Sequence, residues 1–97
     1  MIVVTEKFTK TDSTVLWYYH HWTEEIIKYV EDNYIFNGKM MVIPEEINGE
    51  FSFTRIFEVH EEYQEWINDP VMIASRAKRD AYHAENGITL TITETVQ

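Results

Sequence analysis

The chain has no cysteine, three glycines, two prolines and few basic residues: eight lysines and arginines stand against seventeen aspartates and glutamates. Without cysteine, neither a disulfide framework nor a thiolate metal site can form. The few glycines leave no phosphate-cradling loop, and the scarcity of glycine and proline indicates no linker or low-complexity segment. A net charge of -9 repels nucleic-acid phosphates and anionic membrane surfaces, so we expect neither as a partner.

Long hydrophobic runs are also missing. The sequence contains no run of about eighteen apolar residues, the length needed to span a membrane. The apolar run within the first ten residues, MIVVTEKFTK, is too short for a signal peptide. We therefore expect a cytoplasmic protein. The 97 residues, of which 44% are hydrophobic and 26% charged, predict a single domain over residues 1–97 with a small core that oligomerisation would help.

Hydrophobic periodicity predicts the element order β-α-β-β-α-β. The expected elements are a strand over 2–9, a helix from Val15 to about Asn33, strands over 39–47 and 50–59, a helix over 61–67 that restarts at Pro70, and a strand over 88–96. Asp69 can cap the restarted helix, and Asn86-Gly87 can end it. Its small and apolar side is expected to lie on the sheet; this side comprises Ile73, Ala74, Ala77, Ala81 and Ala84.

Asn48-Gly49 is the strongest local signal, because this pair tolerates positive φ at both central positions of a type I′ turn. A two-residue loop fixes the register of the hairpin. The expected partners are Ile47 with Glu50, Ile43 with Thr54, Met41 with Ile56, Val42 with Arg55 and Met40 with Phe57.

Right-handed crossovers around this hairpin place the four strands in one antiparallel sheet in the order 4-1-3-2, with both helices on one face. This is a ferredoxin-like α+β fold. The side chains expected under the helices are Phe51, Phe53, Phe57, Val59, Ile88, Leu90 and Ile92.

The opposite face of the sheet would then carry threonines and serine together with four large aliphatic side chains, Met41, Ile43, Ile47 and Ile56. Monomers rarely leave such a patch in water, so we expect a second copy to cover it and to form a homodimeric α+β barrel. The alternative is a monomer whose threonine-rich face is wet.

Arg55 lies between Phe53 and Phe57 and by alternation points toward the helices. A buried guanidinium needs a partner, and Glu6 has the matching parity on the neighbouring strand. The alternative is an Arg55 that binds an anion in a ligand cavity.

Histidine and glutamate pairs offer a weaker candidate. His20 and His21 precede Glu24 and Glu25 by four residues, a spacing that can hold a divalent metal, but no third histidine accompanies them, and a solvated helix face explains them better. We predict no metal and no cofactor. His83 and His60 are expected at the surface unless His83 enters a pocket.

The run RIFEV at 55–59, followed by EWINDP at 65–70 and continuing to Ala77, resembles the third strand and second helix of antibiotic-biosynthesis-monooxygenase-like dimeric α+β barrels. The resemblance implies cofactor-free oxidation of aromatic polyketides, as in some members, or haem degradation, as in others. Trp66 matches the haem-ruffling tryptophan. Arg76, however, replaces the iron-ligating histidine, and Glu6 and Lys7 lie where an asparagine is expected, so we reject haem degradation.

Two functional hypotheses follow. In the first, a homodimeric barrel binds a small apolar or aromatic ligand and oxidises it without a cofactor; the residues to test are Trp66, Tyr19, Trp22, Phe53, Arg55 and His83. In the second, the chain is a non-catalytic interaction or scaffold module, and Trp66 simply anchors its helix. A cavity of roughly 300 Å³ or more with converging polar groups would favour the first hypothesis.

Overall fold

The computed structural model describes residues 1–97 and contains one four-stranded antiparallel sheet. Its strands are β1 (Ile2–Lys10), β2 (Met41–Ile47), β3 (Glu50–Phe57) and β4 (Ile88–Val96). The strand order is β2-β3-β1-β4, which confirms the predicted order and the ferredoxin-like α+β class.

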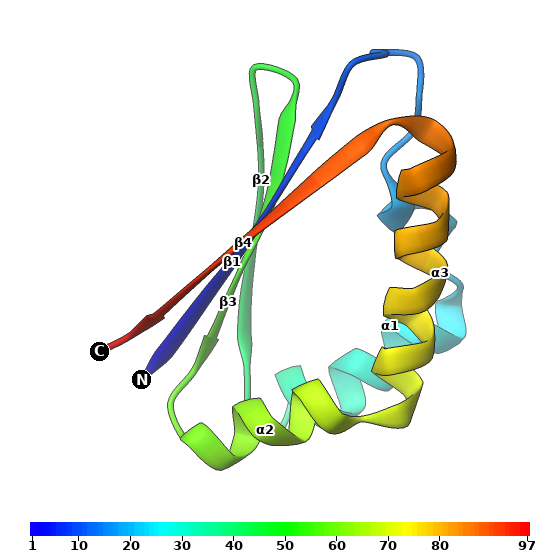
Figure 1. The fold of residues 1–97 in the computed structure, drawn as a ribbon. Coiled ribbons are helices and arrows are strands. Elements are labelled where there is room, and N and C mark those ends of the chain that lie inside the picture. Colours follow the sequence, from blue (N-terminus) through cyan, green and yellow to red (C-terminus); the bar gives the residue numbers. More distant parts are fainter.

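The helical elements all lie on one side of this sheet, and the other face carries none (Figure 1). They are the 3-10 helix η1 (Tyr18–His21), α1 (Glu24–Val30), the π-helix η2 (Glu31–Ile35), α2 (His60–Asn68) and α3 (Pro70–Asn86). None of them has the length and apolar character needed to cross a bilayer.

The β2–β3 hairpin turns at Asn48 and Gly49, whose φ angles are 52° and 78°. Both values belong to the left-handed region that a type I′ turn requires. Four of the five predicted pairs are confirmed: Ile47 with Glu50, Ile43 with Thr54, Met41 with Ile56 and Val42 with Arg55. β2 begins at Met41, so the register does not reach Met40 and Phe57.

The junction between α2 and α3 is fixed by Asp69. Its Oδ1 accepts a hydrogen bond from the Val71 amide at 2.9 Å, so Asp69 caps α3 as predicted, and Pro70 occupies the first helical position. Asp69 Oδ2 also accepts from the hydroxyls of Tyr29 and Tyr34, at 2.7 and 2.5 Å. One carboxylate therefore ties α1 and η2 to the junction. Gly87 ends α3 with a φ of 66°, again as predicted.

The predicted continuous helix from Val15 to Asn33 is wrong. Residues 11–17 have no helix, Trp22 is extended, and α1 begins only after Thr23, whose hydroxyl accepts from the Ile26 amide. Trp17 is buried in a cluster with Phe8, Phe51 and Ile88. Aromatic residues are weak helix formers, so their packing on the sheet outweighs the helical spacing of the sequence.

The sheet face under the helices carries two separate apolar clusters. The larger cluster comprises Ile2, Val4, Val30, Tyr34, Met40, Phe57, Tyr63, Trp66 and Met72, and the smaller one comprises Phe8, Trp17, Phe51 and Ile88. Glu6 lies between Val4 and Phe8 on β1, and Arg55 lies between Phe53 and Phe57 on β3. Two charged residues therefore separate the clusters.

The predicted buried face of α3 is also wrong. Ile73, Ala74, Ala77, Ala81 and Ala84 are all exposed. The buried face instead carries Met72, Ser75 and His83, with Arg76 and Arg79 half-buried. This polar face lies over a cavity, so the helix does not need small residues to approach the sheet closely.

The side chains predicted to lie under the helices are buried or half-buried, with two exceptions. Val59 is 45% exposed because it lies beyond β3 and precedes α2, and Ile92 is 56% exposed although it lies on the helix side of the edge strand β4. On the opposite face, Met41, Ile43 and Ile47 are 60%, 45% and 55% exposed. Ile56 on the same face is half-buried.

Candidate ligand-binding site

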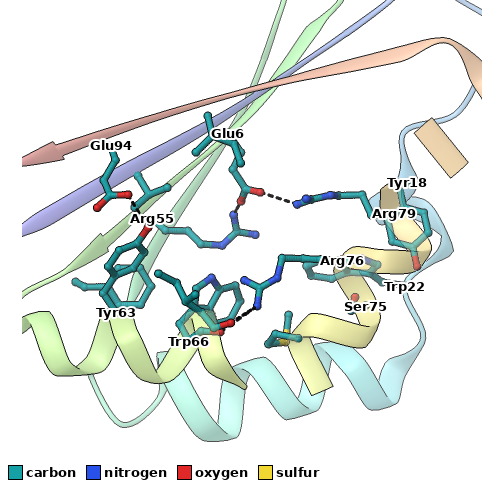
Figure 2. A pocket seen from close by; sticks show the side chains of 15 residues that line it. Glu6, Tyr18, Trp22, Arg55, Tyr63, Trp66, Ser75, Arg76, Arg79 and Glu94 are labelled. Carbon is teal, nitrogen blue, oxygen red and sulfur yellow. Dashed lines mark hydrogen bonds and ion pairs between the residues drawn. The ribbon is translucent and has the colours of Figure 1, made fainter. Parts of the chain in front are cut away.

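A cavity of about 350 Å³ lies between the sheet and helices α2 and α3 (Figure 2). Its apolar wall is largely aromatic, with Tyr18, Trp22, Phe57, Tyr63 and Trp66. Its polar lining comes from β1, β3, β4 and α3 and comprises Glu6, Arg55, Glu94, Ser75, Arg76 and Arg79. The volume and the converging polar groups match those of small-molecule sites, which pair apolar walls with a few placed polar atoms.

A smaller space of about 30 Å³ adjoins this cavity and shares five of its lining residues. The shared residues are Glu6, Tyr18, Trp22, Arg55 and Arg79. The smaller space adds Tyr19, Phe53 and His83, among others, from η1, β3 and α3. The two spaces therefore form one site with Glu6 and the arginines at the boundary.

Arg55 and Glu6 are 6% and 8% exposed and form the predicted ion pair, with Arg55 Nη1 against Glu6 Oε1. Glu6 accepts a second charged hydrogen bond, at 2.7 Å, from Nη1 of Arg79. The expectation of a structural pair is thus confirmed. Both partners also line the cavity, and the alternative, an Arg55 that binds an anion there, stays a prediction.

Three buried nitrogens at this site donate no regular hydrogen bond: Arg55 Nη1 is paired with Glu6 by charge, and Arg55 Nε and Trp22 Nε1 have no partner in the protein. Such groups are rare, and each one usually marks a missing acceptor. Arg55 also lies over the rings of Phe53 and Trp66, with its Cζ 4.9 and 5.2 Å from their centroids. The guanidinium is therefore held by the ion pair with Glu6 and by aromatic contacts, and its Nε has no acceptor.

Burial, and then the neighbouring Arg79 and Arg76, lower the pKa of Arg55 to about 9. The guanidinium remains protonated at neutral pH. Burial also lowers the pKa of Arg76, with Arg79 as a further cause. Three cationic groups thus share one small region, and each destabilises the charge of the next.

Arg76 links the cavity to the end of α2. Its Nη2 donates to the carbonyl oxygens of Ile67 at 2.8 Å and Trp66 at 3.3 Å. A cation at this place also complements the negative end of the helix dipole. Arg76 therefore contributes positive charge to the cavity without a carboxylate partner.

Tyr63 and Glu94 occupy the end of the cavity away from Arg79 (Figure 2). The Tyr63 hydroxyl donates to Glu94 Oε2 at 2.8 Å. Burial and this hydrogen bond raise the pKa of Tyr63 to about 12, so the phenol stays protonated. This carboxylate is satisfied within the protein.

Trp66 fulfils both roles that the sequence suggested. It is 6% exposed, and its ring meets Tyr34 edge-on at 4.9 Å and tilts against Phe57 at 6.3 Å, which anchors α2 on the sheet. It also lines the cavity beside Arg55 and Arg76.

His83 is 6% exposed, so its expectation as a surface residue is wrong. Its ring lies edge-on to Phe8 at 5.4 Å and faces the smaller space. Burial lowers the pKa of His83, and Arg79 lowers it further against the opposing effect of Asp80. His83 is therefore mainly neutral at pH 7 and can accept a proton.

The structure brings all six predicted site residues together. Trp66 lines the larger cavity; Tyr19, Phe53 and His83 line the smaller space; and Trp22 and Arg55 line both. Sequence reasoning missed Arg76, Arg79, Ser75 and Tyr63. The signal for the three residues of α3 was the recurrence of Met72, Ser75, Arg76, Arg79 and His83 at spacings of three and four, which marks one face of a helix.

No three histidine, aspartate or glutamate side chains gather as a metal site would require. His20 and His21 lie in η1, which is separate from the helix that holds Glu24 and Glu25.

No protein-family model matches this sequence, and no curated protein matches it. Among solved structures, the chain is similar to a Deinococcus radiodurans protein provisionally assigned as an antibiotic biosynthesis monooxygenase. The TM-score is 0.66 over 100% of this chain and 92% of that chain, at 10% sequence identity. Such a low identity establishes the fold, and the chemistry must be argued from the site. The chain has the ferredoxin-like α+β fold of the antibiotic-biosynthesis-monooxygenase-like proteins that its sequence resembles.

Proposed function

We propose that this protein binds a small aromatic molecule in the cavity between the sheet and helices α2 and α3. The observation that carries the proposal is a space of about 350 Å³ that combines aromatic walls with converging charged groups. The alternative hypothesis, a scaffold module with a filled core, would leave neither this space nor the unpartnered Arg55 Nε. The whole chain acts as one domain in this proposal.

We further propose that the bound molecule is oxidised without a cofactor. His83 is neutral and can take a proton from a phenol or an activated ring carbon, and Arg55 and Arg79 can stabilise the resulting oxyanion. Dioxygen is the oxidant: one oxygen atom converts a ring CH₂ to C=O and the other leaves as water. The similarity of fold to a protein provisionally assigned as a monooxygenase supports this chemistry.

The proposed functional unit is a homodimer. Met41, Ile43 and Ile47 are all largely exposed on the sheet face that no helix covers, and Ile56 lies beside Met41. Met41, Ile43 and Ile56 lie next to one another there, whereas Glu45 lies between Ile43 and Ile47. An exposed apolar group of this kind marks an interaction surface. A second copy that packs its sheet against this face would bury all four side chains and close the barrel.

The binding proposal is tested by filling the cavity. Ser75 on α3 is buried and lines the cavity, so Ser75→Phe places a ring inside it, whereas Ala74→Phe adds the same ring at the adjacent exposed position. The neutral probe 2-naphthamide is titrated against tryptophan fluorescence, because Trp22 and Trp66 line the cavity. Ser75→Phe should weaken binding at least about tenfold, the equivalent of about 1.4 kcal/mol, while Ala74→Phe binds as the parent does.

Equal binding by the parent and Ser75→Phe, with both proteins folded by circular dichroism, would contradict the proposal. The oxidation step is measured separately as oxygen uptake with anthrone, which carries a ring CH₂. Binding of 2-naphthamide without oxygen uptake, and without loss of anthrone, would retain the binding site and reject the chemistry.

A further inference from the structure

We infer that the ligand of this cavity is an aromatic carboxylate, that Arg55 and Arg79 receive its carboxylate group, and that Glu6 restrains the affinity. This inference rests on the proposed binding function and adds the class of ligand and the residues that determine it.

The charge of the cavity supports an anion. Its lining holds three guanidinium groups, Arg55, Arg76 and Arg79, against two carboxylates, Glu6 and Glu94. Glu94 accepts from Tyr63 at the far end, and Asp80, which pairs with Arg79 at 3.1 Å, lies outside the lining. Glu6 is therefore the one lining carboxylate that contacts the arginines. The lining is thus positive in a chain whose net charge is -9. Burial and then the neighbouring Arg79 lower the pKa values of Arg55 and Arg76, and an added anion relieves the repulsion between these charges.

The geometry supports a carboxylate. Arg55, Arg76 and Arg79 converge on the interior of the cavity from β3 and α3, with Glu6 above them (Figure 2). Arg55 is buried, and its Nε lacks an acceptor. A guanidinium presents its donors in a planar fork that matches the two oxygens of a carboxylate. Arg55 can therefore hold Glu6 through Nη1 and still donate to a ligand through Nε.

The walls beside the arginines support an aromatic body on the ligand. Trp66 lies under the Arg55 guanidinium, and Trp22, with an unpartnered indole Nε1, lies toward the other end. Flat rings stack on such walls, and the unpartnered indole can donate to a polar substituent. A planar molecule with a carboxylate at one edge can stack on the aromatic walls and accept hydrogen bonds from both Arg55 Nε and Trp22 Nε1.

Glu6 competes with a ligand carboxylate for the two arginines. It already occupies Arg55 and Arg79, and it repels an incoming carboxylate at short range. Removing its charge should therefore increase the affinity for an anionic ligand and leave the affinity for a neutral one nearly unchanged. An increase in affinity cannot result from a damaged fold.

The test compares 2-naphthoate with its neutral isostere 2-naphthamide, by tryptophan fluorescence, in the parent and three variants. Arg79→Gln removes a cavity charge, Lys78→Gln removes the same charge from the adjacent exposed residue, and Glu6→Gln removes the competing carboxylate. A charged hydrogen bond corresponds to about a tenfold to hundredfold change in affinity.

We expect the parent to bind 2-naphthoate at least about tenfold more tightly than 2-naphthamide, Arg79→Gln to lose that preference, and Glu6→Gln to enlarge it. Lys78→Gln should behave as the parent. If either the Arg79 or the Glu6 variant does not fold, the other decides. Equal binding of both probes, with no effect of either substitution, would overturn the carboxylate inference and leave the binding site intact. Binding of neither probe would overturn both.

Discussion

Arg55 on β3 and Glu6 on β1 form an ion pair under the helices that separates the two apolar clusters of the core. Both residues are more than nine-tenths buried, and both line the cavity. Buried ion pairs contribute little net stability compared with well-packed apolar side chains. Replacing both residues together should therefore change the free energy of unfolding little. The unpartnered Arg55 Nε is explained better by ligand binding than by folding.

Loss of one partner should be costly. Arg55→Met leaves Glu6 with Arg79 alone, and we expect it to lower the free energy of unfolding by about 2 to 3 kcal/mol, below the usual 3 to 5 for a fully stranded charge. Adding Glu6→Gln should recover part of the loss. Urea denaturation of both variants measures this, and a double variant less stable than the sum of the singles would contradict it.

The ionisation of Asp69 should make the stability of the folded protein depend on pH. Burial raises the pKa of Asp69, but hydrogen bonds from Tyr34, Tyr29 and the amides of Val71 and Met72 outweigh burial and lower the pKa overall. A lowered folded-state pKa adds stability above the unfolded value of about 4, and this stability is lost as pH falls through the folded value. Asp69→Asn should therefore cost about 1 to 2 kcal/mol at neutral pH and flatten the decline below about pH 4.

Urea midpoints at neutral and acid pH provide the measurement for Asp69. Asp32→Asn, at an exposed position of the same helical region, is the matched control and should retain the parent's pH profile. An unchanged profile in Asp69→Asn would show that the carboxylate does not hold the junction.

The hairpin turn gives a purely local prediction. Gly49 has a φ of 78°, and a Cβ added there would meet no atom within 4 Å. Gly49→Ala should therefore cost about 1 kcal/mol from the backbone alone. Asn48→Gly at the neighbouring positive φ should be nearly neutral. Thermal unfolding of both variants distinguishes this account from one in which steric contact at the turn matters.

Dimer formation predicts a sedimentation mass of twice 11.6 kDa. Replacing both Ile43 and Ile56 by aspartate places charges on the bare sheet face and should dissociate the dimer or unfold the protein. Ile73→Asp, at a 51% exposed position of α3 on the opposite side, is the control and should leave the mass unchanged. A monomer at micromolar concentration in the unsubstituted protein would contradict the barrel.

Local chemistry explains which elements the sequence revealed. Asn48-Gly49 determined a turn type and hence a register, and Asp69-Pro70 marked a helix start because cap and proline each have a positional preference. The parity of Glu6 and Arg55 was enough to place both on one sheet face. These inferences depend on neighbouring residues or on simple alternation.

The wrong predictions, which are the helix over 15–33, the buried face of α3 and His83 at the surface, concern places where tertiary packing decides. The aromatic residues from Trp17 to Trp22 recur at helical spacing, yet Tyr19 stacks on Phe51 at 4.6 Å and the chain stays outside an α-helix. On α3, the alanines suggested a buried face, whereas the buried face holds Ser75, Arg76 and Arg79. A polar helix face turned toward a sheet contradicts the usual pattern, and such contradictions concentrate at functional sites.

The most direct test is a crystal structure of the protein grown with 2-naphthoate. We predict a naphthalene ring in the cavity beside Trp66, with the carboxylate at hydrogen-bond distance, about 3 Å, from Arg55 Nε. A cavity closed by collapsed side chains, or naphthoate bound only outside it while the cavity holds solvent, would contradict the account.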